Sequence, residues 1–343
     1  MFEPTQADAQ PRPARRLDRK LGRIAEGRYT PADFVLADAK DADMAFGVTA
    51  VGSLTEAPVA SVGPGLYRTR DSYLESMRSM AGGGVFDILL TSASNGERLV
   101  AEGWPDEEVT LAVRGNDSTD IWLSRGSDYR AAASRPFRTV DLAAIRPFCD
   151  LVLYSVTLNN NVERDLATLE AYRDFRIEAA ALGIRHFLEV FNPNVPVDLK
   201  PDEVAAFVND SVIRVLAGIT SAQRPVFLKL TYNGAGALAE LVEHDPSLVV
   251  GILGGTAGTT RDTFELLHRI EANGGRVALF GRKIQGAESQ PDLVGLMPLV
   301  LRGELDPAGA VRAYHARLTE IGTTPRRALE ADLELTDATL LAE

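Results

Sequence analysis

The chain has 343 residues, of which 45% are hydrophobic and 24% charged, so it has enough apolar material for a core. Its formal net charge of -12 argues against partners such as nucleic acid or an anionic membrane, because both require clustered positive charge. The single cysteine, Cys149, excludes an internal disulfide and a multi-cysteine metal cluster. We therefore expect a soluble, cytoplasmic protein.

The chain is expected to form one domain with extensions at both ends. Residues 1–30 predict an N-terminal arm and a leading helix, the arm because residues 1–16 are rich in Pro, Gln, Ala and Arg without periodicity. Residues 31–320 predict the catalytic domain, since α/β barrels of about 250 residues or more fold as one unit. Residues 321–343 predict a peripheral tail, to which no chemistry is assigned.

Short apolar runs rich in β-forming residues alternate with longer stretches of helical periodicity, which is typical of a parallel sheet. The eight runs are FVLADA (34–39), FDILLT (86–91), VTLAVR (109–114), LVLYSV (151–156), HFLEVF (186–191), VFLKLT (226–231), LVVGIL (248–253) and RVALFG (276–281). They predict a closed (β/α)8 TIM barrel. A doubly wound open sheet is the competing architecture, but its G-x-G-x-x-G fingerprint does not follow the first run.

The first run ends in the charged segment ADAKDAD. In a barrel of this kind catalytic groups sit at the C-terminal ends of the strands. Asp38 and Lys40 share one side of the strand by two-residue alternation, so Asp38 is expected to orient a catalytic lysine or move protons, and Lys40 to tune it. Asp41 and Asp43 are expected to form a solvated acidic loop.

Three further runs contribute polar candidates. Arg114 ends the third run and is a candidate for binding substrate. Tyr154 in the fourth run and Glu189 in the fifth supply a phenol and a carboxylate for acid–base work, although Tyr154 could equally be a core aromatic. Glu189 is hard to bury without a partner, and Lys229 is its natural partner.

Lys229 is the strongest candidate, because the chain has only five lysines against 31 arginines. In VFLKLTYNG, alternation places Lys229 on the same side as Phe227 and Thr231, near the barrel mouth. Apolar surroundings disfavour a charged ammonium and so free the amine to form a Schiff base with a carbonyl, which arginine cannot do. The alternative is a lysine that only balances a strand-end carboxylate.

Two glycine-containing segments follow the seventh and eighth runs, GILGGTAGTTRD and FGRKIQ. Barrels often bind phosphate between these two loops, through backbone N–H groups and a helix N-terminus. The residues expected to take this role are Gly254, Gly255 and Thr256 with Gly281, Arg282 and Lys283.

The four histidines do not predict a metal site, because His186 opens a strand and the others lie on predicted helices. We therefore expect no metal, no other cofactor and no zinc-dependent aldol mechanism. Magnesium held by Asp38, Asp117 and Glu189 is the weaker alternative.

Three segments together resemble the DhnA-type class I aldolases, which include fructose-bisphosphate, sulfofructose-phosphate and tagatose-bisphosphate aldolases. The segments are FVLADAKDAD, FLKLTYNG, and GILGG with VALFGRKIQ and the helix-like DLVGLMPLVLRGELDPAGAVRAY, and the resemblance spans roughly residues 30–318. It implies a barrel, a Schiff base at Lys229, an acidic residue at Asp38 and a proton donor at Tyr154. It also implies phosphate contacts from Gly254, Gly255, Gly281 and Arg282.

The first strand of this family commonly reads Asp-His-Gly, whereas this chain has Asp38, Ala39 and Lys40. We therefore expect a divergent member of the family. The expected activity is metal-independent aldehyde-lyase chemistry on a phosphorylated ketose or related carbonyl compound. An isomerase, an epimerase or a thiolase-like acyl transferase without a Schiff base remains open, as does a non-catalytic barrel that binds sugar phosphates. A homo-oligomer is expected, since such barrels often assemble symmetrically.

Overall fold

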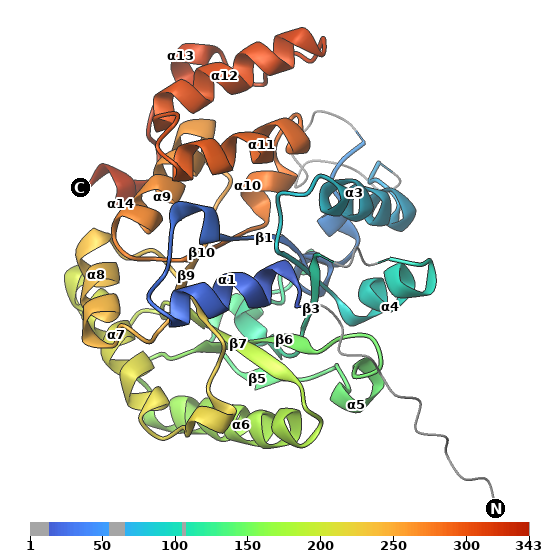
Figure 1. Ribbon diagram of the computed structural model, residues 1–343. Helices are drawn as coiled ribbons and strands as arrows, with labels where there is room; N and C mark the ends of the chain where they lie inside the picture. Colours follow the sequence, from blue (N-terminus) through green and yellow to red (C-terminus); the bar gives the residue numbers. More distant parts are fainter. Residues whose placement is uncertain (1–13, 55–65, 105–107, 343) are drawn as a thin grey trace, which may run out of the picture.

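A computed structural model describes residues 14–54, 66–104 and 108–342. Eight parallel strands close into a barrel in the order β1-β10-β9-β8-β7-β6-β3-β2, with helices around it (Figure 1). The strands are β1 (Val35–Lys40), β2 (Ile88–Thr91), β3 (Thr110–Arg114), β6 (Leu151–Thr157), β7 (Arg185–Phe191), β8 (Leu228–Leu230), β9 (Val250–Leu253) and β10 (Val277–Phe280). The predicted TIM barrel is confirmed, and each predicted run overlaps its strand to within two residues at either end.

Helices alternate with the strands, as the sequence predicted. They are α2 (Asp43–Phe46), α3 (Arg70–Gly82), α4 (Ala93–Ala101), α5 (Leu142–Ile145), α6 (Val162–Ala181), α7 (Pro201–Leu216), α8 (Ala235–His244), α9 (Thr260–Ala272), α10 (Arg282–Gln285), α11 (Gln290–Leu301) and α12 (Pro307–Glu320). Within the described part of the chain, none of the helices has the length and apolar character needed to cross a membrane.

The barrel has an inner core and an outer core, because each strand is buried on both faces. The inner cluster contains Val35, Ala37, Ile88, Leu90, Ala112, Leu151, Leu153, Phe187, Phe227, Val277 and Leu279. Phe187 and Phe227 stack with their ring centroids 4.5 Å apart. Residues of the opposite parity, such as Leu36 and Val152, belong to the outer cluster beneath the helices. Parity along each strand therefore decides whether a side chain reaches the barrel interior.

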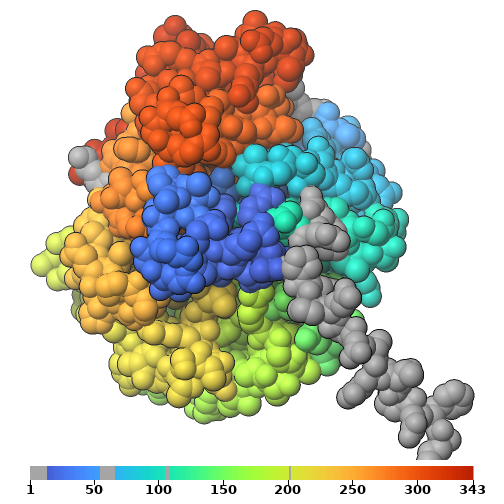
Figure 2. Space-filling view, in the orientation of Figure 1, coloured from blue at the N-terminus to red at the C-terminus, as the bar shows by residue number. Residues whose placement is uncertain are grey.

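An N-terminal helix, α1 (Arg16–Ala25), closes the end of the barrel at which the strands begin. Leu17 is completely buried and joins the inner cluster. The Lys20 ammonium donates to Asp87 at 2.8 Å and to the Phe34 carbonyl at 2.7 Å, just before β2 and β1 respectively. Figure 2 shows the blue N-terminal part of the chain over the centre of this face. The open end is therefore the opposite one, where the strands end.

Two segments lie outside this regular pattern. A short antiparallel pair that the sequence did not predict, β4 (Asp117–Ser118) and β5 (Pro136–Phe137), follows β3. The residues after 320 form α13 (Leu329–Asp332) and α14 (Ala338–Leu341), and this C-terminal segment packs on α9. The N–H groups of Thr336 and Asp337 donate to the Asp262 carboxylate at 2.8 and 3.2 Å. Most of the predicted mobile arm, residues 1–13, lies outside the described residues.

We predict that Phe187→Ala lowers the free energy of unfolding by about 3–5 kcal/mol, because it removes half of the stacked pair and leaves a cavity inside the barrel. Urea denaturation followed by circular dichroism measures this loss. Val162→Ala is the matched control, since Val162 is 77% exposed, and it should change stability by less than about 0.5 kcal/mol. Equal effects of the two substitutions would contradict the assignment of the inner core.

Candidate active site

Lys229 and Glu189 meet inside the barrel near the C-terminal ends of two neighbouring strands. They are paired in register between β8 and β7, and each has the parity of an inner-core phenylalanine two residues before it, Phe227 and Phe187. The Lys229 Nζ lies 2.6 Å from the Glu189 Oε1, and both side chains are almost completely buried. The expected partnership is thus present, but the immediate surroundings of the ammonium are charged rather than apolar.

Arg114 extends this pair into a chain of charges. Its guanidinium donates to the Glu189 Oε2 at 3.1 Å, to the Ser155 hydroxyl at 2.8 Å and to the Asp41 carboxylate at 2.6 Å. The Ser155 hydroxyl in turn donates to the Glu189 Oε2 at 2.5 Å. Asp41, Arg114, Glu189 and Lys229 thus alternate in sign across the barrel mouth, with two charges of each sign.

Asp41 and Arg114 are both kept ionised despite their burial. Burial alone would raise the pKa of Asp41, but the charges of Arg114 and Lys229 lower it below its ordinary value. Burial would likewise lower the pKa of Arg114, while the carboxylates of Asp41 and Glu189 raise it above its ordinary value. Arg114 therefore stays a cation at neutral pH.

The arrangement supports proton transfer between two adjacent groups. At 2.6 Å, the Glu189 carboxylate can take a proton from the Lys229 ammonium directly and leave a neutral amine. Arg114 and Ser155 both hold the other carboxylate oxygen, which fixes the orientation of Glu189. Such fixed geometry is what a nucleophile and its base require.

The structure does not bring Asp38 and Lys40 to this cluster. Asp38 has the parity of Leu36 and lies on the outer face of β1, where the Lys40 Nζ is 3.4 Å from its Oδ1. Lys40 donates to Gln285 of α10 and Gln290 of α11 at 2.8 and 2.9 Å. Burial raises the pKa of Asp38 and lowers that of Lys40, against the attraction between them. The aspartate that reaches the mouth is Asp41, so the predicted solvated loop is wrong at this residue, which is buried.

Tyr154 also lies away from Lys229. It packs in the outer cluster against Tyr172 and Phe175 of α6, with ring centroids 5.1 and 4.4 Å away. Its neighbour Ser155 has the inward parity and contacts Glu189. Ser155 was not among the predicted site residues, because the period-2 signal is lost in a strand whose faces are both buried.

The two glycine-containing loops lie at the C-terminal ends of β9 and β10, as predicted. Packing and backbone conformation account for two of their glycines without any ligand. A Cβ on Gly281 would lie 2.8 Å from the Ala39 carbonyl, and Gly255 has a φ of +65°. The Gly254 N–H donates to the Leu279 carbonyl at 3.1 Å, so it is engaged within the sheet. Thr256 is exposed.

Arg282 and Lys283 are adjacent in sequence, but their side chains lie in different environments. Desolvation and the charge of Arg130 lower the pKa of Arg282, and the charge of Glu189 acts in the opposite direction. Arg282 therefore lies within electrostatic reach of the mouth. Lys283 instead donates to the Ala257 carbonyl at 3.3 Å, and it feels the charges of Asp262 and Asp337.

The carboxylates considered for magnesium do not converge. Asp38 lies outside the barrel, and Asp117 accepts a 2.9 Å hydrogen bond from the Thr139 hydroxyl. Among the residues that the structure describes, no group of three or more His, Cys, Asp or Glu side chains has metal-binding geometry.

We predict that Asp41→Asn lowers the free energy of unfolding at pH 7 by about 3 kcal/mol, because it leaves Arg114 with less buried negative charge. Since the folded-state pKa of Asp41 is depressed, its contribution is full above the unfolded pKa of about 3.9. It is lost as the pH falls through the lower folded-state value, so wild type and variant should converge in strong acid. Urea denaturation at several pH values tests this, with exposed Asp71→Asn as the control; a gap that persists in strong acid would contradict it.

No protein-family model matches the chain, and no curated protein matches it. Solved structures do. An archaeal fructose 1,6-bisphosphate aldolase is 14% identical, covers 84% of this chain and 99% of its own, and has a TM-score of 0.58. Another archaeal aldolase structure, with its catalytic lysine bound to the carbinolamine intermediate of its substrate, is 14% identical, covers 84% and 100%, and scores 0.59.

The fructose-bisphosphate aldolase from Slackia heliotrinireducens is 15% identical, covers 92% of this chain and 96% of its own, and has a TM-score of 0.59. At such identities the likeness establishes the fold alone. The resemblance indicated by the sequence is thus confirmed at that level: this chain has the (β/α)8 barrel of the DhnA-type, Schiff-base aldolases, at low sequence identity.

Proposed function

We propose that the chain is a class I aldolase-type lyase that makes or breaks a carbon–carbon bond through a Schiff base on Lys229. The observation that carries the proposal is the 2.6 Å contact between Lys229 and Glu189 at the barrel mouth. The shared fold supports it, since the structures with this fold include Schiff-base aldolases. The proposed substrate is a phosphorylated ketose or a related carbonyl compound.

In the proposed mechanism Glu189 first removes a proton from the Lys229 ammonium. The neutral amine adds to the substrate carbonyl, and the carbinolamine loses water to give an iminium ion. A base then removes the C4 hydroxyl proton, the C3–C4 bond breaks, and its electron pair passes into the iminium to form an enamine. Protonation of the enamine carbon and hydrolysis of the imine regenerate Lys229.

Asp41 is the carboxylate we propose for proton transfers beyond Glu189, in place of Asp38. Its depressed pKa keeps it ionised, and it shares Arg114 with Glu189. Arg114 would hold both carboxylates in place. Tyr154 takes no part, because it packs against α6 outside the barrel.

The substrate phosphate is proposed to bind between the loops after β9 and β10. Gly255, Thr256, Gly281 and Arg282 are the candidates, and the cationic Arg282 lies within reach of the mouth. We propose that the reaction needs no metal or other cofactor, and that the enzyme is a cytoplasmic homo-oligomer.

One observation favours a second function. The 2.6 Å contact places Lys229 and Glu189 as an adjacent proton donor and acceptor, which is the arrangement of a general acid and a general base. A phosphosugar isomerase or epimerase would use Lys229 and Glu189 in this way without an imine.

We predict that borohydride traps a covalent adduct on Lys229 when the protein is incubated with a panel of ketose and triose phosphates. Intact-mass spectrometry detects the adduct, and peptide mapping assigns it among only five lysines. Lys229→Met should abolish the adduct, whereas Lys200→Met, which changes an exposed side chain, should retain it. Turnover of a panel member without any adduct, together with loss of that turnover in Lys229→Met, would favour the isomerase.

We also predict that Glu189→Gln slows adduct formation by about 10²–10⁴-fold, because the amide keeps the size of the side chain but cannot accept the ammonium proton. Rapid quenching with borohydride at fixed substrate concentration measures the rate. The loss should shrink as the pH approaches the range in which the amine deprotonates unaided. An unchanged rate at neutral pH would exclude Glu189 as the base.

A further inference from the structure

A pocket of about 320 Å³ lies between the loop before α9, the turn at α10 and the C-terminal segment. Ala257, Thr259, Lys283, Arg326 and Arg327 are among its lining residues. No residue of the buried cluster at the barrel mouth lines it, and neither does Arg282. The pocket is therefore distinct from the candidate active site, although both use the loops after β9 and β10.

The charged lining of this pocket is positive in a strongly acidic protein. Lys283, Arg326 and Arg327 carry three positive charges, and Glu288 carries one negative charge, which leaves a local excess of two. The whole chain has a formal net charge of -12. Such a concentration of cations around a concave space is what an anionic ligand requires.

Lys283 is the central observation. Its side chain is only 4% exposed, and its ammonium has three donors. Within the described ranges it makes a single hydrogen bond, 3.3 Å long, to the Ala257 carbonyl, and no carboxylate lies within ion-pair distance. Burial lowers its pKa to about 8, although Asp262 and Asp337 act in the opposite direction. A buried ammonium with so few partners is costly unless a ligand supplies acceptors.

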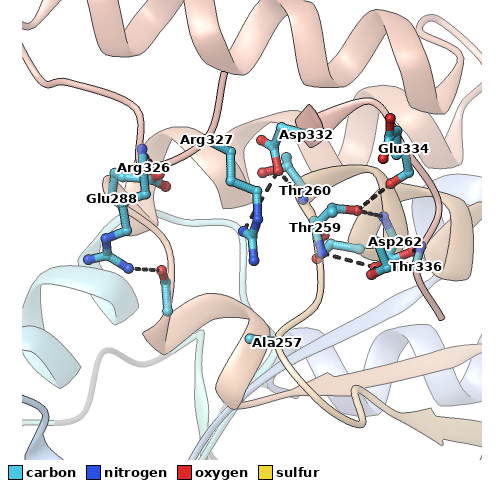
Figure 3. Close-up of polar contacts among 12 residues, drawn as sticks. Ala257, Thr259, Thr260, Asp262, Glu288, Arg326, Arg327, Asp332, Glu334 and Thr336 are labelled. Carbon is cyan, nitrogen blue, oxygen red and sulfur yellow. Dashed lines mark hydrogen bonds and ion pairs between the residues drawn. The ribbon is translucent and has the colours of Figure 1, made fainter. Parts of the chain in front are cut away.

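The two arginines enter from the C-terminal segment, and Figure 3 shows both extending from it toward the barrel loops. Arg326 donates from its guanidinium to the Gly286 carbonyl and from its backbone to Glu288. Among the residues that the structure describes, Arg327 has one distant ion pair, 3.9 Å, to Asp332. A guanidinium has five N–H donors, so both side chains keep donors for a ligand.

The start of α9 fixes these arginines rather than forming the anion site itself. The Thr260 N–H already donates to the Asp332 carboxylate at 2.8 Å, and the Thr259 hydroxyl donates to the Glu334 carbonyl at 2.8 Å (Figure 3). His315 of α12 holds the other Asp332 oxygen at 3.0 Å. The segment that carries Arg326 and Arg327 is therefore anchored, so its cations are positioned in advance.

We propose that this pocket is a second ligand site, which binds a small molecule bearing a phosphate group through Lys283, Arg326 and Arg327. A volume of about 320 Å³ exceeds that of a bare ion and lies in the range typical of small-molecule sites. Leu293 and Ala287 supply an apolar wall for a short carbon skeleton. The proposal does not rest on the aldolase function, since no residue of the buried mouth cluster takes part.

Isothermal titration calorimetry with inorganic phosphate, at ionic strength held constant with chloride, tests the site. We expect saturable binding that is weakened at least about tenfold in Lys283→Met and in Arg327→Gln, since each removes a charged donor. Lys283→Arg should retain most of the affinity. Lys200→Met, which changes an exposed lysine outside the pocket, is the control and should leave this binding unchanged.

Two outcomes would overturn the proposal: no saturable binding, or binding that neither Lys283→Met nor Arg327→Gln weakens. In the second case, loss of that binding in Arg282→Gln would place the phosphate at the barrel mouth. Arg327→Gln changes a side chain that is 49% exposed, so misfolding does not confound it. A site-resolved measurement supports the titration. Phosphate should slow acylation of Lys283 by a small electrophile, as mass spectrometry quantifies, and leave exposed Lys200 unaffected.

Discussion

The candidate active site depends on one constraint: charges buried at the barrel mouth must be paired. An isolated charge in a low-dielectric interior is strongly unfavourable, and Arg114 solves this problem for two carboxylates at once. Because Arg114 contacts both Asp41 and Glu189, three strands and the loop after β1 are tied into one arrangement. Lys229 completes the balance. Loss of any one member leaves the cluster with an excess of one buried charge, so stability and chemistry are coupled at this site.

The barrel interior is charged at the end where the strands finish, and it is covered by α1 at the end where they begin. The stacked Phe187 and Phe227 lie directly below the Glu189 and Lys229 layer, and α1 covers the opposite end with Leu17 inserted into the inner core. This apolar layer lowers the local dielectric constant and so strengthens the electrostatic interactions beside it. The apolar and charged layers thus occupy the same strands, two residues apart.

The C-terminal segment packs on the outside of the barrel, against α9. It is attached to the start of α9 by two carboxylates. The Asp262 carboxylate of α9 accepts from the backbone N–H of Thr336, and the Asp332 carboxylate of the C-terminal segment accepts from the backbone N–H of Thr260. A helix N-terminus attracts negative charge, so these contacts are favourable without any ligand. They bring Arg326 and Arg327 beside Lys283. The two neighbouring cations of α10 therefore lie in different places: Arg282 is near the barrel mouth, and Lys283 lines the second pocket.

The sequence by itself determined the barrel, because eight apolar runs with helical stretches between them leave few other arrangements, and the strand boundaries agree to within two residues. It also identified Lys229, Glu189 and Arg114, since buried charges near strand ends stand out against an apolar background. It paired Lys229 with Glu189, and the structure has that contact.

Only the tertiary structure decided which side of each strand faces inward. Both faces of a parallel strand are apolar, so the alternation that marks a half-exposed strand is missing, and parity cannot be read from the residues. For this reason the residues alone did not show that Asp38 and Tyr154 face away from the barrel interior, or that Asp41 and Ser155 reach the cluster. The role of the C-terminal segment was equally hidden, because Arg326 and Lys283 lie far apart in sequence and meet only through folding.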